Sequence, residues 1–373
     1  MIYLDYAATT PINEEVLKSF NQVMNNYFAN PASSHALGTK SALLEKKARE
    51  QIASLLRVEE NEIIFTSGAT ESNNLAIKGC CLKYRNRGNH IITSKVEHAS
   101  VLNAFKQLED EFNFKVTYLE VDEFGKVSLE SLKNALTPDT FFVSIMAVNN
   151  EVGTINDIEA MGKLLKKYPK IIFHSDATQA IGKIEFDYSN CDLISMSAHK
   201  INGFKGSGLL IKKKNIDPLP LLSGGGQEQN IRSGTNNFPY EVALAKTLRI
   251  ALEKQKEHFD YVQNLNELLR QKLLTLNGVK INSPLDASPY ILSFSVNKKA
   301  SVVSEYLSIK EIYVSTKSAC SSKKSPKSYV LQAMGRDDIA AENVIRISLS
   351  HLNNLQEIEI FINELKNALN SIK

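Results

Sequence analysis

Short apolar runs and amphipathic stretches alternate along the chain between about residues 40 and 212. The apolar runs predict strands at 62–66, 90–94, 115–121, 140–148, 170–175, 192–197 and 208–212. The stretches between them predict helices at 70–84, 98–109 and 158–168. Such alternation is typical of a mainly parallel sheet covered by helices on both faces. We therefore predict an α/β fold.

The last third of the chain has a different pattern. A long helical stretch at 239–276 leads away from the strand-rich region, and shorter strands at 290–296 and 344–348 and a helix at 355–372 follow it. A chain of 373 residues with 43% hydrophobic content can bury more than one compact core. We predict a large α/β domain over 14–255 and a small α+β domain formed by 1–13 and 256–373.

Charge and cysteine content narrow the class of protein. The 44 basic and 41 acidic residues nearly cancel, which argues against nucleic-acid binding as the main activity. Four cysteines in a chain of this length form no disulfide framework and suit a reducing cytoplasm. We see no basic and apolar leader and no apolar stretch near the ~20 residues that a membrane span needs. We expect a cytoplasmic protein without membrane contact.

Candidate chemistry follows the predicted strands, because ligands of such sheets collect beyond the carboxyl ends of the strands. After the first strand comes Thr66-Ser-Gly-Ala-Thr-Glu-Ser72. Gly68 permits a tight turn, and the N–H groups of Ala69 and Thr70 open a helix, where an anion is favoured. A Ser or Thr at such a place is more often an ordinary helix cap. The segment by itself therefore leaves both readings open.

Three further strand ends carry an imidazole, an acid and a lysine. His98 alone fits a surface or core histidine as well as a catalytic one. Asp176 suits a cap or an ion pair, and it equally suits the carboxylate that keeps a pyridinium nitrogen protonated. Lys200 ends a buried strand, where desolvation favours the neutral amine that Schiff-base chemistry needs. An anion cup, an imidazole, an acid and then a lysine 24 residues after the acid form the order of pyridoxal 5′-phosphate (PLP) sites.

The motifs together resemble those of a known family. They are the segments 3–11, 30–35, 66–72, 97–98, 148–153, 176–179, 197–200, 232–235, 318–320 and 345–346. On these motifs, from Tyr3 to about Leu349, the chain resembles the class V aminotransferase family, in particular cysteine desulfurases of the NifS/IscS type. The resemblance implies a PLP-dependent transferase of fold type I, like aspartate aminotransferase, and a homodimer with sites at the subunit interface.

The resemblance also implies roles for single residues. Lys200 would carry PLP as a Schiff base, His98 would stack on its ring, and Asp176 would pair with its ring nitrogen. The residues implied at the ring substituents and the phosphate are Asn150, Gln179, Ala69, Thr70, Ser197, His199 and, from the partner subunit, Thr235. Arg346 would clamp the substrate carboxylate with its bidentate guanidinium, and Asn150 would also face the substrate. No metal is implied.

Cys320 lies in a Ser- and Lys-rich segment at 315–328. A free cysteine is most often a small buried hydrophobe, but this segment has no large apolar residue and its lysines favour the thiolate. Cys80 and Cys81 lie on an apolar helix and suit a structural role, and we assign none to Cys191. The resemblance implies that Cys320 takes sulfur from L-cysteine, releasing L-alanine, and passes it from a persulfide to an acceptor or scaffold protein. Iron–sulfur cluster assembly and tRNA thiolation are the implied uses.

Other functions remain open at this point. The same fold supports another class V reaction, such as that of a selenocysteine lyase or an aminotransferase, or a non-catalytic PLP-binding scaffold for sulfur-transfer proteins. The chain departs from the family pattern at Asn202, Phe204, Gln229-Asn230 and Pro326-Lys327. It also ends at Lys373, without the longer partner-docking tail of housekeeping members. These differences concern loop shape and partner contacts.

Overall fold

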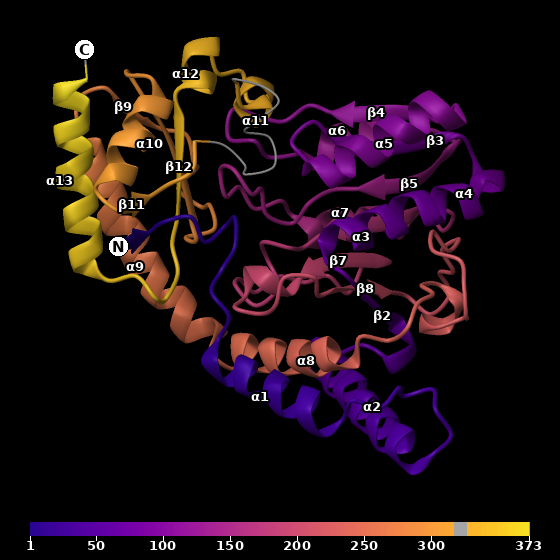
Figure 1. Cartoon of the computed structure of the whole chain (residues 1–373). Helices are drawn as coiled ribbons and strands as arrows, with labels where there is room; N and C mark the ends of the chain where they lie inside the picture. The colour runs from indigo at the N-terminus through magenta and orange to yellow at the C-terminus, as the bar shows by residue number, and fades with distance from the viewer. Residues whose placement is uncertain (317–326, 373) are drawn as a thin grey trace.

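The largest sheet among the described residues has seven strands (Figure 1). The computed structural model describes residues 1–316 and 327–372. The strands are β2 (Ile63–Thr66), β3 (His90–Ser94), β4 (Lys115–Leu119), β5 (Thr140–Ser144), β6 (Ile172–Asp176), β7 (Leu193–Ser197) and β8 (Gly208–Lys212). Their order is β2-β8-β7-β6-β5-β3-β4, and β8 alone runs antiparallel to its neighbours. The mainly parallel sheet that the sequence predicts is confirmed.

Apolar side chains cover both faces of this sheet because neighbouring residues of a strand point to opposite sides. In β2, Ile63 and Phe65 join one core while Ile64 joins the other. The first core contains residues of α2 (Ala36–Leu56), α6 (Leu129–Ala135), α7 (Ile158–Leu165) and α8 (Phe238–Glu253). The second contains residues of the π-helical turn η2 (Leu75–Gly79), α4 (Cys80–Lys83) and α5 (Ala99–Phe112). Helix α3 (Ala69–Asn74) precedes η2 and contacts α5.

Polar residues at the strand–helix junctions decide where several helices begin. The side chains of Asn13, Ser128 and Asp157 accept hydrogen bonds from the first turns of α1 (Glu14–Asn26), α6 and α7. His98 does the same for α5 through its ring. Such caps satisfy backbone N–H groups that have no partner inside the helix. These helices therefore begin at polar residues whose side chains cap their first turns.

The C-terminal elements pack together with the first residues of the chain (Figure 1). An antiparallel sheet has the order β12-β10-β9, formed by β12 (Val344–Ser348), β10 (Ile291–Val296) and β9 (Val279–Ile281). Strand β1 (Ile2–Tyr3) pairs in parallel with β11 (Ile312–Tyr313). The helices here are α9 (Gln255–Leu274), α10 (Ala300–Ile309), α11 (Tyr329–Ala333), α12 (Asp338–Glu342) and α13 (Leu355–Ser371). The division into 14–255 and the remainder stays a prediction.

The structure differs from the predicted elements in several places, of which three concern long segments. Strand β5 ends at Ser144, whereas the apolar run extends to Val148. The predicted helix at 239–276 is two helices, α8 and α9, that meet at Lys254. Helices α1 and α2 were not predicted, and both pack against α8. Among the described residues, no helix combines the length and the apolarity that crossing a membrane requires.

Candidate active site

A cavity of about 370 Å³ lies where the parallel strands end. Ten of the predicted site residues line it: Ala69, Thr70, His98, Asn150, Asp176, Gln179, Ser197, His199, Lys200 and Arg346. Thr235 is exposed and does not line this cavity. Cys320 lies outside the described residues. The structure therefore brings most of the predicted residues together, and their individual roles remain predictions.

Lys200 follows β7 at the end of the short helix η4 (Ala198–Lys200). Its Nζ donates hydrogen bonds to the carbonyl oxygens of Ala7 and Ala8, both at 2.7 Å. The N-terminal segment is held against η4 because Thr10 donates to the His199 carbonyl through both its backbone N–H and its hydroxyl, each at 2.9 Å. The lysine amine is thus fixed between the end of β7 and the N-terminal segment.

Asp176 is the last residue of β6 and is 4% exposed. Its Oδ2 accepts a hydrogen bond from Asn73 Nδ2 at 2.8 Å, and its Oδ1 accepts one from the Thr178 backbone N–H at 3.0 Å. Both carboxyl oxygens of Asp176 therefore accept a hydrogen bond, which fixes the orientation of the side chain. An acid held in this way can pair with a positively charged ring nitrogen in the cavity.

An anion would find donors around Gly68. Gly68 precedes α3 with φ +144°, and no side chain caps the first turn of that helix. A Cβ at Gly68 would lie 3.3 Å from Ser197 Oγ, so a side chain here would narrow the space between the helix start and Ser197. Burial, together with the charges of Lys200 and Lys205, lowers the pKa of His199 to about 4. His199 is therefore neutral at pH 7, and Lys205 adds a positive charge at the cavity wall.

Gln179 is oriented by a buried lysine. Lys183 Nζ donates to Gln179 Oε1 at 2.7 Å, and Gln179 Nε2 donates to the Ala7 carbonyl at 3.0 Å. Burial, together with the charges of Lys200 and Arg346, lowers the pKa of Lys183 to about 7. Because the Gln179 oxygen is occupied by Lys183, its amide presents only N–H to the cavity.

Arg346 lies in β12 and reaches the same cavity from the C-terminal sheet. Its Nη1 donates to the Asn150 carbonyl at 2.9 Å, and its Nη2 donates to Asp5 Oδ1 at 2.6 Å. Among the described residues, Arg346 Nε and Asn150 Oδ1 are buried without a hydrogen-bond partner. The guanidinium is therefore held in place while part of its donor capacity is unused.

Sequence reasoning missed Asn73, Ser100, Lys183 and Lys205. Asn73 and Ser100 lie inside helices, and Lys183 and Lys205 lie in connecting segments. The contact of Asn73 with Asp176 arises only through the tertiary fold, whereas Lys183 contacts Gln179 and Ser100 contacts His98 within a few residues of sequence. The TESNN and QAIGK spacings could have drawn attention to Asn73 and Lys183, because a helical turn separates them from Thr70 and Gln179.

Cys80, Cys81 and Cys191 are buried, and burial raises the pKa of each thiol above its ordinary range. A thiol in that state is a poor nucleophile, which agrees with the structural role expected of Cys80 and Cys81.

Lys327, which follows the residues that the structure does not describe, forms an ion pair with Asp338 at 2.6 Å.

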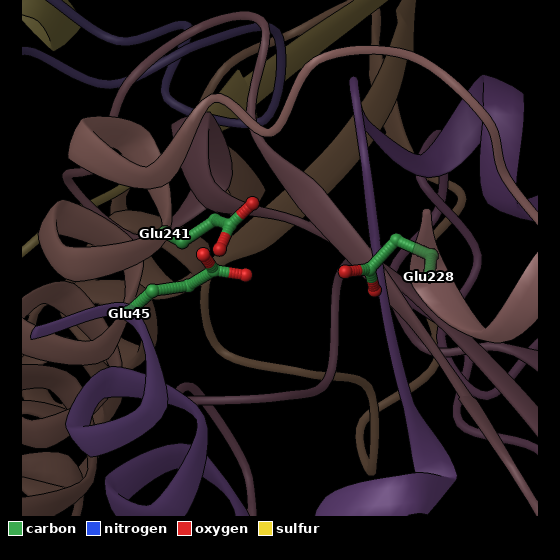
Figure 2. A group of neighbouring side chains, drawn as sticks. All are labelled: Glu45, Glu228 and Glu241. Carbon is green, nitrogen blue, oxygen red and sulfur yellow. The ribbon is translucent and has the colours of Figure 1, made fainter. Parts of the chain in front are cut away.

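A separate acidic cluster lies between α2, η5 (Glu228–Asn230) and α8, and Figure 2 shows the side chains of Glu45 and Glu241 converging while Glu228 faces them. Carboxylate oxygens of the three residues lie within 4.8 Å of one another. Arg49 already pairs with Glu228 at 2.5 Å, and Asn236 donates to Glu45 at 2.6 Å. Glu241 Oε2 is buried without a partner among the described residues, and burial raises the pKa of Glu241 to about 9. Glu241 is therefore protonated at pH 7.

Comparison with known proteins places this site in a family. The model of the family described as aminotransferase class-V matches residues 2–361. The chain belongs to this family. The cavity of this class-V protein brings together a lysine, a buried acid and the start of a helix that no side chain caps.

Relatives of this class-V chain match along nearly its whole length. It is 44% identical to a NifS/IcsS protein homolog from Lactobacillus delbrueckii subsp. bulgaricus, over 97% of this chain and 95% of that protein. It is 43% identical to a cysteine desulfurase IscS from Vibrio vulnificus, over 100% of this chain and 93% of that protein. A solved NifS-like protein superposes with a TM-score of 0.93 at 39% identity, covering 99% of both chains. The PLP-transferase fold expected from the motifs is confirmed.

Proposed function

We propose that this class-V chain is a PLP-dependent cysteine desulfurase, which converts L-cysteine to L-alanine and leaves the sulfur as a persulfide on Cys320. The observation that carries the proposal is the cavity that joins Lys200, Asp176, His98 and Arg346. Full-length relatives named cysteine desulfurase support the same reaction. A solved relative that is 35% identical to this chain, SspA, is described as being in complex with cysteine.

The residues present fit PLP. A side chain at Gly68 would narrow the space beside Ser197, and the N–H groups at the start of α3, which no side chain caps, would face an anion bound there. Asp176 would offer a carboxylate to the ring nitrogen, and Lys200 would offer an amine to the aldehyde carbon. Asn150 and Gln179 lie at the wall for the ring substituents. When bound, PLP supplies an electron sink for the negative charge that develops at the substrate Cα.

The chain's own residues would then do the following work. Arg346 would bind the substrate carboxylate through the donors that Asp5 and the Asn150 carbonyl leave unused. The Lys200 amine would accept the proton from the substrate Cα, because it is held at the end of β7 within the cavity. His98 would cover the ring face at the start of α5. These roles extend the resemblance residue by residue.

The sulfur step balances without an external oxidant or reductant. The Cys320 thiolate attacks the substrate sulfur, an S–S bond forms, and the substrate C–S bond breaks. The bonding electron pair stays with the carbon, which takes up a proton and leaves as part of alanine. A later acceptor thiolate or a reductant would remove the sulfur from Cys320.

The assembly and setting of the enzyme belong to the same proposal. We expect a cytoplasmic homodimer in which Thr235 of each subunit completes the phosphate site of the other. This expectation is supported by the exposure of Thr235 and its absence from the cavity lining of its own chain. The sulfur acceptor would be a protein of iron–sulfur cluster assembly or of tRNA thiolation.

The decisive experiment supplies purified protein and PLP with labelled L-cysteine and measures alanine, sulfide and protein-bound sulfur. The wild type should form alanine and carry one labelled sulfur on the peptide containing Ser318-Ala-Cys320. Cys320→Ser should bind cysteine but lose sulfur transfer, because a serine hydroxyl is a far poorer nucleophile toward sulfur. Cys191→Ser, which changes a buried cysteine, is the matched control and should retain transfer.

Three kinds of result would contradict the proposal. Pyruvate or a keto acid instead of alanine would indicate another class V reaction. A persulfide on Cys80, Cys81 or Cys191, or undiminished alanine formation by Cys320→Ser, would contradict the role of Cys320. Preference for selenocysteine with little turnover of cysteine would identify a selenocysteine lyase.

A further inference from the structure

A line of hydrogen bonds joins Asp176 to His98 behind the cavity wall. Asn73 Nδ2 donates to Asp176 Oδ2 at 2.8 Å and to Ser100 Oγ at 2.9 Å. Ser100 Oγ lies 2.8 Å from His98 Nδ1. Asn73 is fully buried and Ser100 is 9% exposed. The acid for the ring nitrogen and the histidine over the ring are therefore linked through two residues that have no role in the motifs.

The direction of each hydrogen bond follows from the charge on Asp176. Turning the Asn73 amide over would place its oxygen against the carboxylate of Asp176 at 2.8 Å, so the Asn73 nitrogen must face Asp176. Both hydrogens of that nitrogen are then used, and Ser100 Oγ accepts one of them. The Ser100 hydroxyl proton is left to donate to His98 Nδ1.

The backbone reinforces this arrangement. The N–H of Ser100 also points at His98 Nδ1, at 3.2 Å, because His98 caps α5. A nitrogen that accepts from two donors carries no proton of its own. The ring proton of neutral His98 therefore sits on Nε2, the nitrogen on the other side of the ring, and His98 lines the cavity.

We propose that Asn73 and Ser100 are positioning residues that hold His98 in the tautomer with its proton on Nε2. This inference deepens the proposed function and rests on it. In this state Nε2 offers the cavity an N–H donor and has no lone pair with which to accept a proton. His98 would thus orient an acceptor atom of the substrate or of PLP, and removal of the Cα proton would fall to Lys200.

The tautomer can be measured without reference to turnover. Protein with bound PLP and ¹⁵N-labelled histidine would be sedimented and its ring nitrogens recorded by magic-angle-spinning NMR, which is not limited by the size of the assembly. His98→Gln assigns the His98 signals by their loss. Ser100→Ala removes the hydroxyl donor, and Ser100→Thr restores it. Ser175→Ala is the matched control, because Ser175 adjoins Asp176, is fully buried, and has no hydrogen-bond partner for its hydroxyl among the described residues.

In the wild type, His98 Nδ1 should show an unprotonated signal and Nε2 a protonated one. Ser100→Ala should introduce a population with the proton on Nδ1 and lower kcat/KM for cysteine about fivefold, the size of one lost hydrogen bond, while PLP affinity stays unchanged. Ser100→Thr should restore both values, and Ser175→Ala should alter neither.

A proton on Nδ1 of wild-type His98, or identical His98 signals in the wild type and in Ser100→Ala, would overturn the proposal. A purely structural role for Ser100 predicts reduced stability without a change of tautomer. Failure of the proposed function has a different signature, since wild-type protein would then form no alanine from cysteine whatever the tautomer of His98.

Discussion

Glu241 gives the sharpest prediction about stability. It is 5% exposed in α8, and its pKa is raised to about 9 chiefly by burial and next by the charges of Glu228 and Glu45. In the unfolded chain it returns to its ordinary value near 4.5. Between these values the folded chain keeps the proton and the unfolded chain releases it. The folded state is therefore penalised by about 1.4 kcal/mol for each pH unit in this window.

Replacing Glu241 by Gln removes this titration. At about pH 7.5 the penalty amounts to roughly 4 kcal/mol, since the pH then lies about three units above the ordinary Glu pKa. The Gln amide can donate to the Glu45 carboxylate that Figure 2 shows beside it. We expect Glu241→Gln to stabilise the protein by about 2–4 kcal/mol at that pH and by little near pH 5.

Urea unfolding at pH 5, 6, 7 and 8, with PLP in equal excess throughout, measures the difference between variant and wild type. Glu253→Gln in the same helix is the control, because Glu253 is exposed and should show no gain that depends on pH. A gain from Glu241→Gln that stays constant from pH 5 to 8, or a loss of stability at pH 8, would refute the reasoning.

Three further variants test the cavity. Lys200→Ala should abolish the absorbance of PLP bound to a protein lysine, and borohydride should then attach no PLP to the chain. PLP attached to another lysine after borohydride treatment would contradict the assignment. Arg346→Ala should raise the KM for cysteine more than it weakens PLP binding, and unchanged KM with loss of PLP would reverse that role. Lys183→Met should weaken PLP binding about fivefold in an absorbance titration, because Gln179 loses the hydrogen bond that orients its amide. Lys246→Met, a change at a partly exposed ion pair, should leave PLP affinity unaltered.

The sequence predicted those parts of the fold that have strong local patterns. The buried runs ending at Asp176 and Ser197 were located within two residues, because apolar strands followed by polar residues are distinctive. Helix α2 was missed because its buried face consists largely of small residues, among them Ser41 and Ala48, which give little hydrophobic periodicity. The break at Lys254 carries no glycine or proline, so local sequence gave no signal for it.

The site was predictable where chemistry and strand ends coincide, as at Lys200 and Asp176. Contacts between distant helices were not predictable. Asn73 and Ser100 meet only because α3 and α5 pack on the same face of the sheet, and neither residue type is unusual within a helix. The raised pKa of Glu241 likewise depends on carboxylates that come from segments far apart in the sequence.

The pairing of the N-terminal segment with the C-terminal sheet bears on when the active site can form during synthesis. Ala7 and Ala8 supply the acceptors of Lys200, but the strand that precedes them pairs with Ile312, and Asp5 pairs with Arg346 across 341 positions. When the strands of the large sheet have left the ribosome during synthesis, Ile312 and Arg346, the partners of this segment, have not yet been made. Contacts between residues so far apart in sequence form late in folding, because closing the long loop costs chain entropy before any contact stabilises it. The hydrogen bonds that hold the Lys200 amine thus form only once nearly all of the chain has been made.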